Sequence, residues 1–428
     1  MPEPKKRVLF VDDEPRVLDG LRRMLHKLRD EWEMEFVTSA REALEALEKR
    51  PFDVVVSDMR MPEMDGAVLL NQVRERFPSA VRLILSGQSD REMLVKSVGP
   101  THQFLSKPCD ADTLKATVVR AGALRERLAD EQLKAVVSGI RALPSVPGLY
   151  MQLLEVLQQP DSSLQAVARI ISSDVAMTAK VLQLVNSAFF GLRRHIESPA
   201  QAIAYLGVDT IKAVVLTAGA FTGFEDSRQA REVAEALYPH SALVGDVAAR
   251  IVRTVTSDKD MFDIATMAGM LHDVGKLVFA AELPEMWRAA VRTARERHLS
   301  SSEAERQACG VGHAELGAYL LGLWGLPDLI VEAVAFHHAP SLCPCHGFSA
   351  LTAVHTADAL TSGPVPGAEA EVTAGLDMEY LERLGEAKRL PEWQALVAQT
   401  RSVAQTQSAA QTRSAAQAVV RDEEQANA

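Results

Sequence analysis

Short apolar runs alternate with amphipathic stretches through roughly the first 120 residues of the chain. Runs rich in β-branched and aromatic residues predict five strands, at Val8–Val11, Met34–Thr38, Asp53–Ser57, Arg82–Ser86 and Gln103–Ser106. Apolar positions spaced three and four residues apart predict helices between the strands, such as Arg16–Leu28 and Ala40–Lys49. Such β/α units predict a doubly wound, flavodoxin-like parallel sheet of the α/β class, with helices on both faces.

A long helical pattern follows this α/β region. Helical periodicity runs from Asp110 to about Ile140, although the apolar positions slip in phase between Leu128 and Leu133. We interpret it as the last helix of the first domain followed by a helical linker at residues 123–143. The alternative is a signalling helix that also packs between two protomers and would make the protein a homodimer.

Proline residues mark the start of a second domain. Pro144 and Pro147 break the helical pattern, and residues 144–362 then show almost only helical periodicity. This predicts an all-α domain. Residues 363–393 are less regular and predict an irregular or helical extension. Beyond Trp393 the composition narrows to Ala, Gln, Ser, Thr and Arg, which predicts a low-complexity tail at residues 394–428 that is disordered or a frayed helix.

Composition narrows the functional class. A chain of 428 residues is long enough for two or three domains, and its 47% apolar and 24% charged residues are ordinary for globular protein. The net charge of −11 argues against broad binding to nucleic acid. No run of about 18 apolar residues predicts a membrane span, and the first residues lack a signal-peptide core. Four scattered cysteines do not predict disulfides, which favours a cytoplasmic location: Cys109, Cys309, Cys343 and Cys345.

Chemically active side chains follow the predicted strands of the first domain. Asp12 and Asp13 close the first strand, Asp58 the third, Ser86 the fourth and Lys107 the fifth. Because parallel strands present their carboxyl ends at one edge of the sheet, we expect these side chains to lie close together.

This grouping predicts the chemistry of a phosphorylated aspartate. A carboxylate oxygen of Asp58 attacks phosphorus, and the charge on the phosphoryl group must be neutralised where it forms. Mg²⁺ does so with oxygen ligands, for which Asp13 and Asp58 are suitable, with Asp12 acting through water and the Arg60 carbonyl completing the set.

The remaining residues of the set contact the phosphoryl group or respond to it. Lys107 supplies a cation and the Ser86 hydroxyl a hydrogen bond for the phosphoryl oxygens, and Phe104 can swing inward once Ser86 moves. Residues 5–122 closely resemble the receiver domains of two-component response regulators. The resemblance implies phosphotransfer from a sensor histidine kinase to Asp58, with Ser86, Phe104 and Lys107 relaying the change.

The second domain concentrates histidines and aspartates. Eight of the eleven histidines lie at or after His240. Imidazole and carboxylate groups from several helices suit a transition-metal centre, and Lys276 shares the Asp273 face, where it could meet a phosphate. The candidate metal ligands, for Fe, Mn or another divalent ion, are His240, His272, Asp273, His313, His337, His338 and Asp358.

These residues match the ligand positions of the HD superfamily of metal-dependent phosphohydrolases. The surrounding sequence resembles one branch of it, the HDOD domain, in Leu143-Pro144-Ser145-Val146-Pro147, Ala202-Ile203-Ala204-Tyr205-Leu206-Gly207 and Leu323-Trp324-Gly325-Leu326-Pro327. That resemblance implies a non-catalytic output module acting through protein partners. Related cyclic-di-GMP phosphodiesterases carry Gly-Tyr-Pro after the His-His doublet, whereas Ala339-Pro340-Ser341 follows here.

Three functions of the histidine cluster therefore stay open. In the first the domain is a signalling adaptor without chemistry, and in the second a metal-dependent phosphodiesterase acting on cyclic di-GMP or another nucleotide. In the third the histidines only stabilise a helical scaffold. Cys343-Pro344-Cys345-His346 is too crowded for a standard zinc site, and we expect a surface loop there. Direct DNA binding conflicts with the acidic charge and with the absence of a convincing helix-turn-helix pattern.

Overall fold

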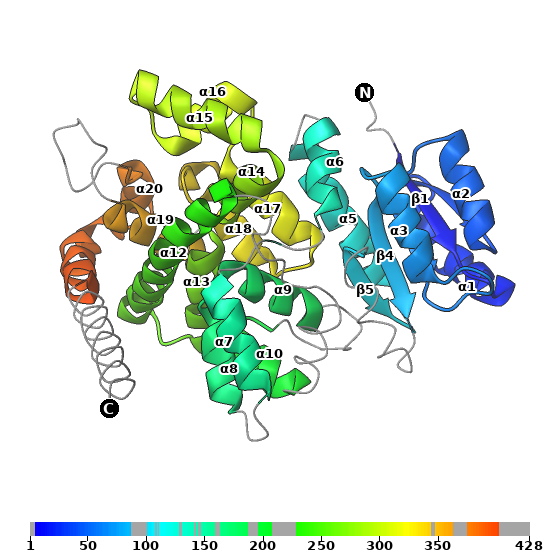
Figure 1. The fold of residues 1–428 in the computed structure, drawn as a ribbon, viewed down its shortest axis with the longest axis horizontal. Coiled ribbons are helices and arrows are strands. Elements are labelled where there is room, and N and C mark those ends of the chain that lie inside the picture. The colour runs from blue at the N-terminus through cyan, green and yellow to red at the C-terminus, as the bar shows by residue number, and fades with distance from the viewer. Residues whose placement is uncertain are drawn as a thin grey trace, which may run out of the picture.

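The computed structural model contains a parallel sheet with its helices and, beside it, a larger helical bundle (Figure 1). Helices α5 and α6 lie between the two parts (Figure 1). The structure describes residues 5–86, 101–107, 109, 111–127, 131–140, 143, 147–158, 163–186, 196–207, 228–343, 347–362 and 375–401.

The sheet has five parallel strands in the order β2-β1-β3-β4-β5, which is the flavodoxin-like topology. They are β1 (Lys6–Val11), β2 (Trp32–Val37), β3 (Val54–Asp58), β4 (Val81–Ser86) and β5 (Gln103–Ser106). Each predicted strand is confirmed to within two residues, because apolar runs between turn residues mark strands that are buried on both faces. The α/β prediction for this domain is also confirmed.

Helices cover both faces of the sheet. Leucines of α1 (Pro15–Met24) and α5 (Ala111–Arg127) pack with Val8, Phe10, Val54 and Val56 on one face. Residues of α2 (Ala40–Lys49) and α3 (Gly66–Arg76) pack with Leu9, Val11 and Val55 on the other. The side chains of α2 and α3 form a separate core, whereas the face under α1 and α5 continues into the helical bundle.

Two helices are described in the helical stretch predicted from Asp110 to Ile140. They are α5 (Ala111–Arg127) and α6 (Glu131–Gly139), and α6 contacts α17 and also α3. Leu133, Val137 and Ile140 are at most 5% exposed, so this chain's own core already buries the apolar face of α6. These three side chains are therefore not free to pack between protomers in this arrangement.

The described part of the second domain consists of helices and short connections, which confirms the all-α prediction. Its first helices are α7 (Pro147–Gln158), α8 (Leu164–Ser172), α9 (Val175–Val185), α10 (Pro199–Leu206), α12 (Arg228–Val255), α13 (Lys259–Leu271) and α14 (Val274–Glu282). Then follow α15 (Pro284–Arg297), α16 (Ser301–Cys309), α17 (His313–Leu323), α18 (Asp328–Phe336), η3 (Pro340–Leu342), α19 (Ala350–Thr361), α20 (Met378–Arg383) and η4 (Ala387–Arg389).

The predicted disordered or frayed tail begins too early. Residues 390–401 are helical, Trp393 and Val397 are buried, and the Trp393 indole N–H donates to Thr254 Oγ1 at 2.9 Å. An amphipathic turn with one tryptophan suffices to dock on α12, although the local composition suggests disorder. Residues 402–428 lie outside the described residues.

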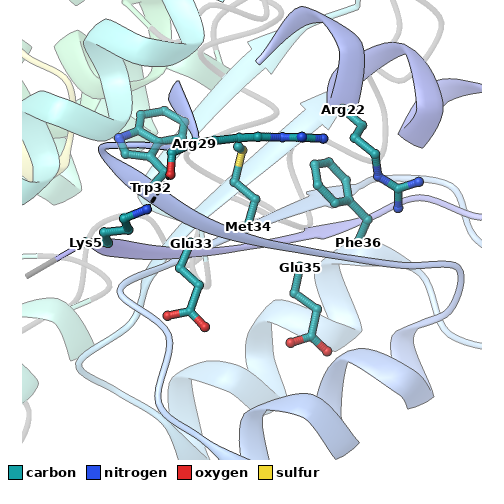
Figure 2. A pocket seen from close by; sticks show the side chains of 8 residues that line it. All are labelled: Lys5, Arg22, Arg29, Trp32, Glu33, Met34, Glu35 and Phe36. Carbon is teal, nitrogen blue, oxygen red and sulfur yellow. Dashed lines mark hydrogen bonds between the residues drawn. The ribbon is translucent and has the colours of Figure 1, made fainter. Parts of the chain in front are cut away.

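An apolar helical segment and a surface cleft complete the description of the fold. Residues Lys259–Glu282 are apolar and long enough to cross a membrane, but 83% of the apolar window is buried inside the protein, which accounts for its composition. An open cleft of about 700 Å³ runs along the edge strand β2 (Figure 2). Trp32, Met34 and Phe36 point to one side of the strand there, and Glu33 and Glu35 to the other (Figure 2).

Candidate functional sites

The predicted phospho-acceptor site lies at the carboxyl ends of β1, β3 and β5. Asp12 and Asp58 are 2% and 7% exposed, and Lys107 reaches both carboxylates. Its Nζ lies 2.6 Å from Asp12 Oδ2 and also donates to Asp58 Oδ1. An ammonium thus occupies the position between two carboxylates that a divalent cation would compete for.

Close packing of α3 orients Asp58. A Cβ added at Gly66 would lie 2.0 Å from the Asp58 carbonyl oxygen, so α3 starts directly against the phospho-acceptor backbone. The Asp65 side chain caps this helix by accepting from the Val68 N–H at 2.8 Å. The Arg60 N–H donates to Asp58 Oδ2 at 2.8 Å and fixes the carboxylate from the opposite side.

Charge and burial act against each other in this site. Burial raises the pKa of Asp58, and the hydrogen bond and charge of Lys107 offset part of that rise. Burial alone would lower the pKa of Lys107, but its bonds to Asp12 and Asp58 outweigh burial and raise it. The lysine therefore stays charged, and its positive charge favours the ionised, nucleophilic form of Asp58.

For the other predicted receiver residues the structure gives mainly the position of the backbone. Asp13 follows Asp12 and is partly exposed, at the edge of the same site. Ser86 ends β4 and Phe104 lies within β5, as predicted, but their side chains lie outside the described residues. The Arg60 backbone lies in the loop after β3.

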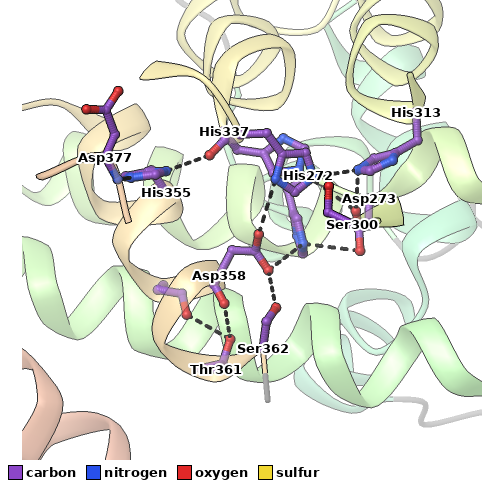
Figure 3. Close-up of polar contacts among 12 residues, drawn as sticks. His272, Asp273, Ser300, His313, His337, His355, Asp358, Thr361, Ser362 and Asp377 are labelled. Atoms are coloured by element: carbon purple, nitrogen blue, oxygen red, sulfur yellow. Dashed lines mark hydrogen bonds and ion pairs between the residues drawn. The ribbon is translucent and has the colours of Figure 1, made fainter. Parts of the chain in front are cut away.

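The histidine cluster draws its members from six helices and their ends (Figure 3). His272 ends α13 and Asp273 precedes α14, while His313 is the first residue of α17. His337 and His338 follow α18 directly. His240 on α12 and Asp358 on α19 complete the set, so all seven predicted residues converge although they span 119 positions of sequence.

Asp273 is the centre of the cluster. Its Oδ1 lies 3.0 Å from His313 Nε2, and its Oδ2 lies 2.6 Å from Lys276 Nζ and 3.4 Å from His272 Nε2. Asp358 Oδ1 lies 3.2 Å from His240 Nε2. Two groups of candidate ligand atoms, each within 4.8 Å of one another, share Asp273: with His313, His337 and His338, and with His240 and His272. Its carboxylate is therefore placed to bridge two positions.

Hydrogen bonds behind the rings fix which nitrogen faces the cluster. His272 Nδ1 lies 2.7 Å from the Gly269 carbonyl oxygen, and His337 Nδ1 lies 2.8 Å from that of Val334. A carbonyl can only accept, so both Nδ1 atoms carry hydrogen. When neutral, each ring consequently turns an Nε2 lone pair toward the carboxylates, which is the tautomer that a metal ion needs.

Glycines bring the helices close enough for this convergence. A Cβ at Gly275 would lie 1.9 Å from the His313 carbonyl oxygen, so α14 and α17 meet there without an intervening side chain. A Cβ at Gly269 would lie 2.7 Å from Gly245 Cα, which joins α13 to α12 in the same way. These contacts set Asp273 beside His313 and His272 beside His240.

Two buried ring nitrogens of the cluster have no hydrogen bond within the described part of the chain. They are His272 Nε2 and His337 Nε2, whereas Asp273 Oδ1 lies 3.0 Å from His313 Nε2. Burying such groups without a partner costs about 1–3 kcal/mol each. Because both nitrogens are metal-ligand atoms that face the carboxylates, a divalent transition metal is the partner that fits them.

The charges of the cluster also require cations. Burial would raise the pKa of Asp273, but Lys276, His272 and His313 together hold it well below its usual range. Burial and Lys276 lower the pKa of His313, yet Glu305 and Asp273 raise it to about 9. Burial lowers the pKa of His338 to about 3. Without a metal, protons on some imidazoles therefore balance the carboxylates.

Two residues near the cluster were not predicted. Glu305 lies eight residues before His313 and contacts it, and no motif in the sequence signals this. His355 lies beside the ligands but is not one of them. Its Nδ1 bonds the His337 carbonyl oxygen at 2.7 Å and its Nε2 accepts from the Asp377 N–H at 2.9 Å, so both ring nitrogens are used (Figure 3).

Two protein-family models match the chain. The family model described as response regulator receiver domain matches residues 8–119, and the model described as HDOD domain matches residues 143–340. The chain therefore carries a receiver domain followed by an HDOD domain. The receiver match includes Asp12, Asp58 and Lys107. The HDOD match ends before α19, so Asp358 lies beyond it.

Curated relatives match parts of the chain. An uncharacterized protein of Treponema pallidum is 26% identical over 204 residues, 48% of this chain and 39% of its own length. The hydrogenase transcriptional regulatory protein HoxA of Cupriavidus necator is 39% identical over 123 residues, 28% of this chain and 25% of its own. The chain spans less than half of the length of these curated relatives.

Solved structures resemble the chain only in part. The MmoQ response regulator of Methylococcus capsulatus is 20% identical, with 59% of this chain and 98% of that chain covered and a TM-score of 0.46. The signal receiver domain of an HD domain-containing protein from Pseudomonas fluorescens is 30% identical, with coverages of 30% and 97% and a TM-score of 0.28.

Proposed function

We propose that Mg²⁺-dependent phosphorylation of Asp58 controls the HDOD domain, which acts mainly by contacting other proteins. The observation that carries this proposal is the Asp12–Lys107–Asp58 arrangement, in which one ammonium bonds two buried carboxylates. A sensor histidine kinase is the phosphodonor that the receiver domain implies. We place this activity in the cytoplasm, where a thiol such as that of Cys309 stays reduced.

The residues divide the chemistry among them. An Asp58 oxygen forms a bond to phosphorus while the phosphorus–nitrogen bond to the kinase histidine breaks. Mg²⁺, held by Asp12, Asp13, Asp58 and the Arg60 carbonyl, would neutralise the phosphoryl oxygens. Lys107 can leave Asp12 to bond a phosphoryl oxygen, because its ammonium already lies against the accepting carboxylate.

The signal has a physical route into the output domain. Gln103 in β5 directly precedes Phe104, and its Nε2 lies 3.1 Å from the carbonyl oxygens of both Gly322 and Leu323 at the end of α17. α17 begins with His313, and the sheet face under α5 shares its apolar core with the bundle. A shift of β5 on phosphorylation would thus move the end of α17 and the surface around it.

Phosphorylation of the full-length chain tests the first half of this proposal. Acetyl phosphate with Mg²⁺ should add one phosphoryl group, detected by mass spectrometry, and Asp58→Asn should abolish the addition. Asp65→Asn is the matched control, since asparagine caps α3 equally well and the change removes one charge nearby. Unchanged labelling of Asp58→Asn would contradict the assignment of the acceptor.

A second candidate function is metal-dependent hydrolysis of a phosphodiester such as cyclic di-GMP. The unsatisfied ligand nitrogens of His272 and His337 support a bound metal, which hydrolysis requires, over a scaffold role. A bound Fe, Mn or similar ion would supply a Lewis acid and an activated water. Lys276, bonded to Asp273 at 2.6 Å, could meet a substrate phosphate.

Metal analysis followed by a cyclic di-GMP assay separates the two candidates. Both the enzyme and a metal-bearing adaptor predict stoichiometric metal that His272→Ala removes. Only the enzyme predicts turnover, which the same substitution should abolish. Metal without turnover supports the adaptor with a structural ion, and absence of metal from protein produced with Fe and Mn would refute the metal centre.

A further inference from the structure

Glu305 is a buried carboxylate that contacts a candidate ligand from behind. It lies on α16 with 1% of its surface exposed. Its Oε2 accepts from the His313 backbone N–H at 2.7 Å and lies 2.6 Å from His313 Nδ1. The opposite ring nitrogen, Nε2, lies 3.0 Å from Asp273 Oδ1 and 2.9 Å from His338 Nε2.

We propose that Glu305 is the positioning residue of the metal centre, holding His313 with Nε2 directed at the metal position. The inference rests on the metal centre proposed above. A carboxylate oxygen can only accept, so His313 Nδ1 carries the hydrogen, and the free lone pair of the neutral ring is on Nε2. The bond to the backbone N–H fixes the same oxygen at the start of α17, so the ring cannot turn without breaking one of the two contacts.

Glu305 differs in charge from the groups that orient the neighbouring ligands. His272 and His337 are oriented by the carbonyl oxygens of Gly269 and Val334, which are neutral backbone groups. Among these three rings, only His313 has a charged group at Nδ1, and a charged acceptor there makes an imidazole a stronger donor of electrons to a metal. His313 should therefore be a strong ligand of the set.

Burial argues against a purely structural role for Glu305. Its second oxygen, Oε1, has no hydrogen bond in the described part of the chain. An ionised carboxylate buried with an unpaired oxygen is a costly way to secure a helix end. The cost is understandable when the charge of Glu305 offsets that of a cation bound at the other side of His313.

The test compares metal affinity with apo stability in the full-length protein. Co²⁺ titrations, followed by visible absorption, give the Kd of wild type, Glu305→Ala, Glu305→Gln and Glu303→Gln. Glu303 lies on the same helix but is exposed, and glutamine preserves its capping box with Ser300. Thermal unfolding of the metal-free proteins reports any structural effect.

We expect Glu305→Ala to weaken Co²⁺ binding by about tenfold or more and Glu305→Gln by less, since an amide oxygen can still accept from Nδ1. Glu303→Gln should bind like the wild type. If Glu305→Gln is as stable as the wild type and binds Co²⁺ as tightly, the positioning role is refuted. If the wild type itself binds no Co²⁺, the proposed metal centre fails instead, so the two failures are distinguishable.

Discussion

In the receiver domain, two carboxylates at strand ends hold one lysine between them, with 28% of that lysine side chain exposed. In the helical domain, Asp273 also holds a lysine, but imidazoles surround it on its other sides. The first site offers only oxygen atoms and a cation that can move away. The second offers mainly nitrogen atoms whose orientations are fixed by bonds behind the rings.

This difference separates a site that loads an ion briefly from one suited to a resident ion. Oxygen ligands suit Mg²⁺, and at this proposed Mg²⁺ site Lys107 bonds two of the same carboxylates. Buried imidazoles with unsatisfied nitrogens favour a transition metal that stays. Signal chemistry in the first site requires reversibility, whereas fixed orientation in the second serves either a structural ion or catalysis.

In both sites a glycine lets one backbone segment pack directly against another. Substituting these glycines should have the largest effects. Gly66→Ala would place a methyl group 2.0 Å from the Asp58 carbonyl oxygen, and Gly275→Ala would place one 1.9 Å from that of His313. The backbones must move apart, which we expect to cost about 3 kcal/mol of unfolding free energy in each variant. Denaturant unfolding measures the cost.

Each substitution should impair only the site that contains it. Gly66→Ala should impair phosphorylation and spare metal content, and Gly275→Ala should do the reverse. Gly20→Ala is the control, because nothing lies within 4 Å of the added methyl group and alanine favours α1 by about 0.5–1 kcal/mol. Equal loss of both functions in either variant would show that the two sites do not fold independently.

Much of the receiver site could be predicted from the sequence because strand ends converge by topology. Once five parallel strands are recognised, Asp12, Asp58 and Lys107 must share one edge of the sheet. The histidine cluster was predicted by resemblance and not by geometry. Helical periodicity does not reveal that Asp358 would meet His240, because nothing local relates α12 to α19.

The contacts that were missed depend on tertiary packing. Glu305 reaches His313 only because α16 ends at Gly310, whose φ of +74° turns the chain back toward α17. The bonds of Gln103 to Gly322 and Leu323 join positions more than 200 residues apart.

Replacing the lysine of either site should have effects of intermediate size, and these effects compare the two sites directly. Lys107→Met should raise the Mg²⁺ affinity of the receiver up to about tenfold, or 1.4 kcal/mol, because no cation then competes for Asp12 and Asp58. Lys276→Met should raise Co²⁺ affinity less, since Lys276 bonds only Oδ2 of Asp273. Isothermal titration measures both affinities.

The phosphorylation rate is the second measurement to make on Lys107→Met. This variant should bind Mg²⁺ more tightly than the wild type but relay the signal poorly, because the phosphoryl oxygens lose their cation. A Lys107→Met protein with weaker Mg²⁺ binding would mean that the lysine organises the carboxylates and does not compete with the ion. In that case the reversible-loading argument for the receiver site would be wrong.

The smallest expected effect concerns Lys180, a buried lysine of α9 that lies between the two domains. Carboxylates raise the pKa of Lys107 and Lys276, whereas burial lowers the pKa of Lys180 to about 7. Its folded pKa is therefore below that of the unfolded chain, which binds more protons between about pH 7 and 10. The unfolding free energy should therefore rise with pH across this interval.

Trp324 limits the size of this rise. The Lys180 Nζ lies 5.1 Å from the centre of the indole ring, and this attraction favours the charged form. We therefore expect a gain of about 1 kcal/mol between pH 7 and 9, measured by denaturant unfolding, that Lys180→Met should remove. Lys259→Met, at an exposed lysine that starts α13, should keep the slope. If the unfolding free energy of Lys180→Met still rises with pH, another group causes the rise. The surroundings of Lys180 would then differ from the two ion sites only because they contain no set of metal ligands.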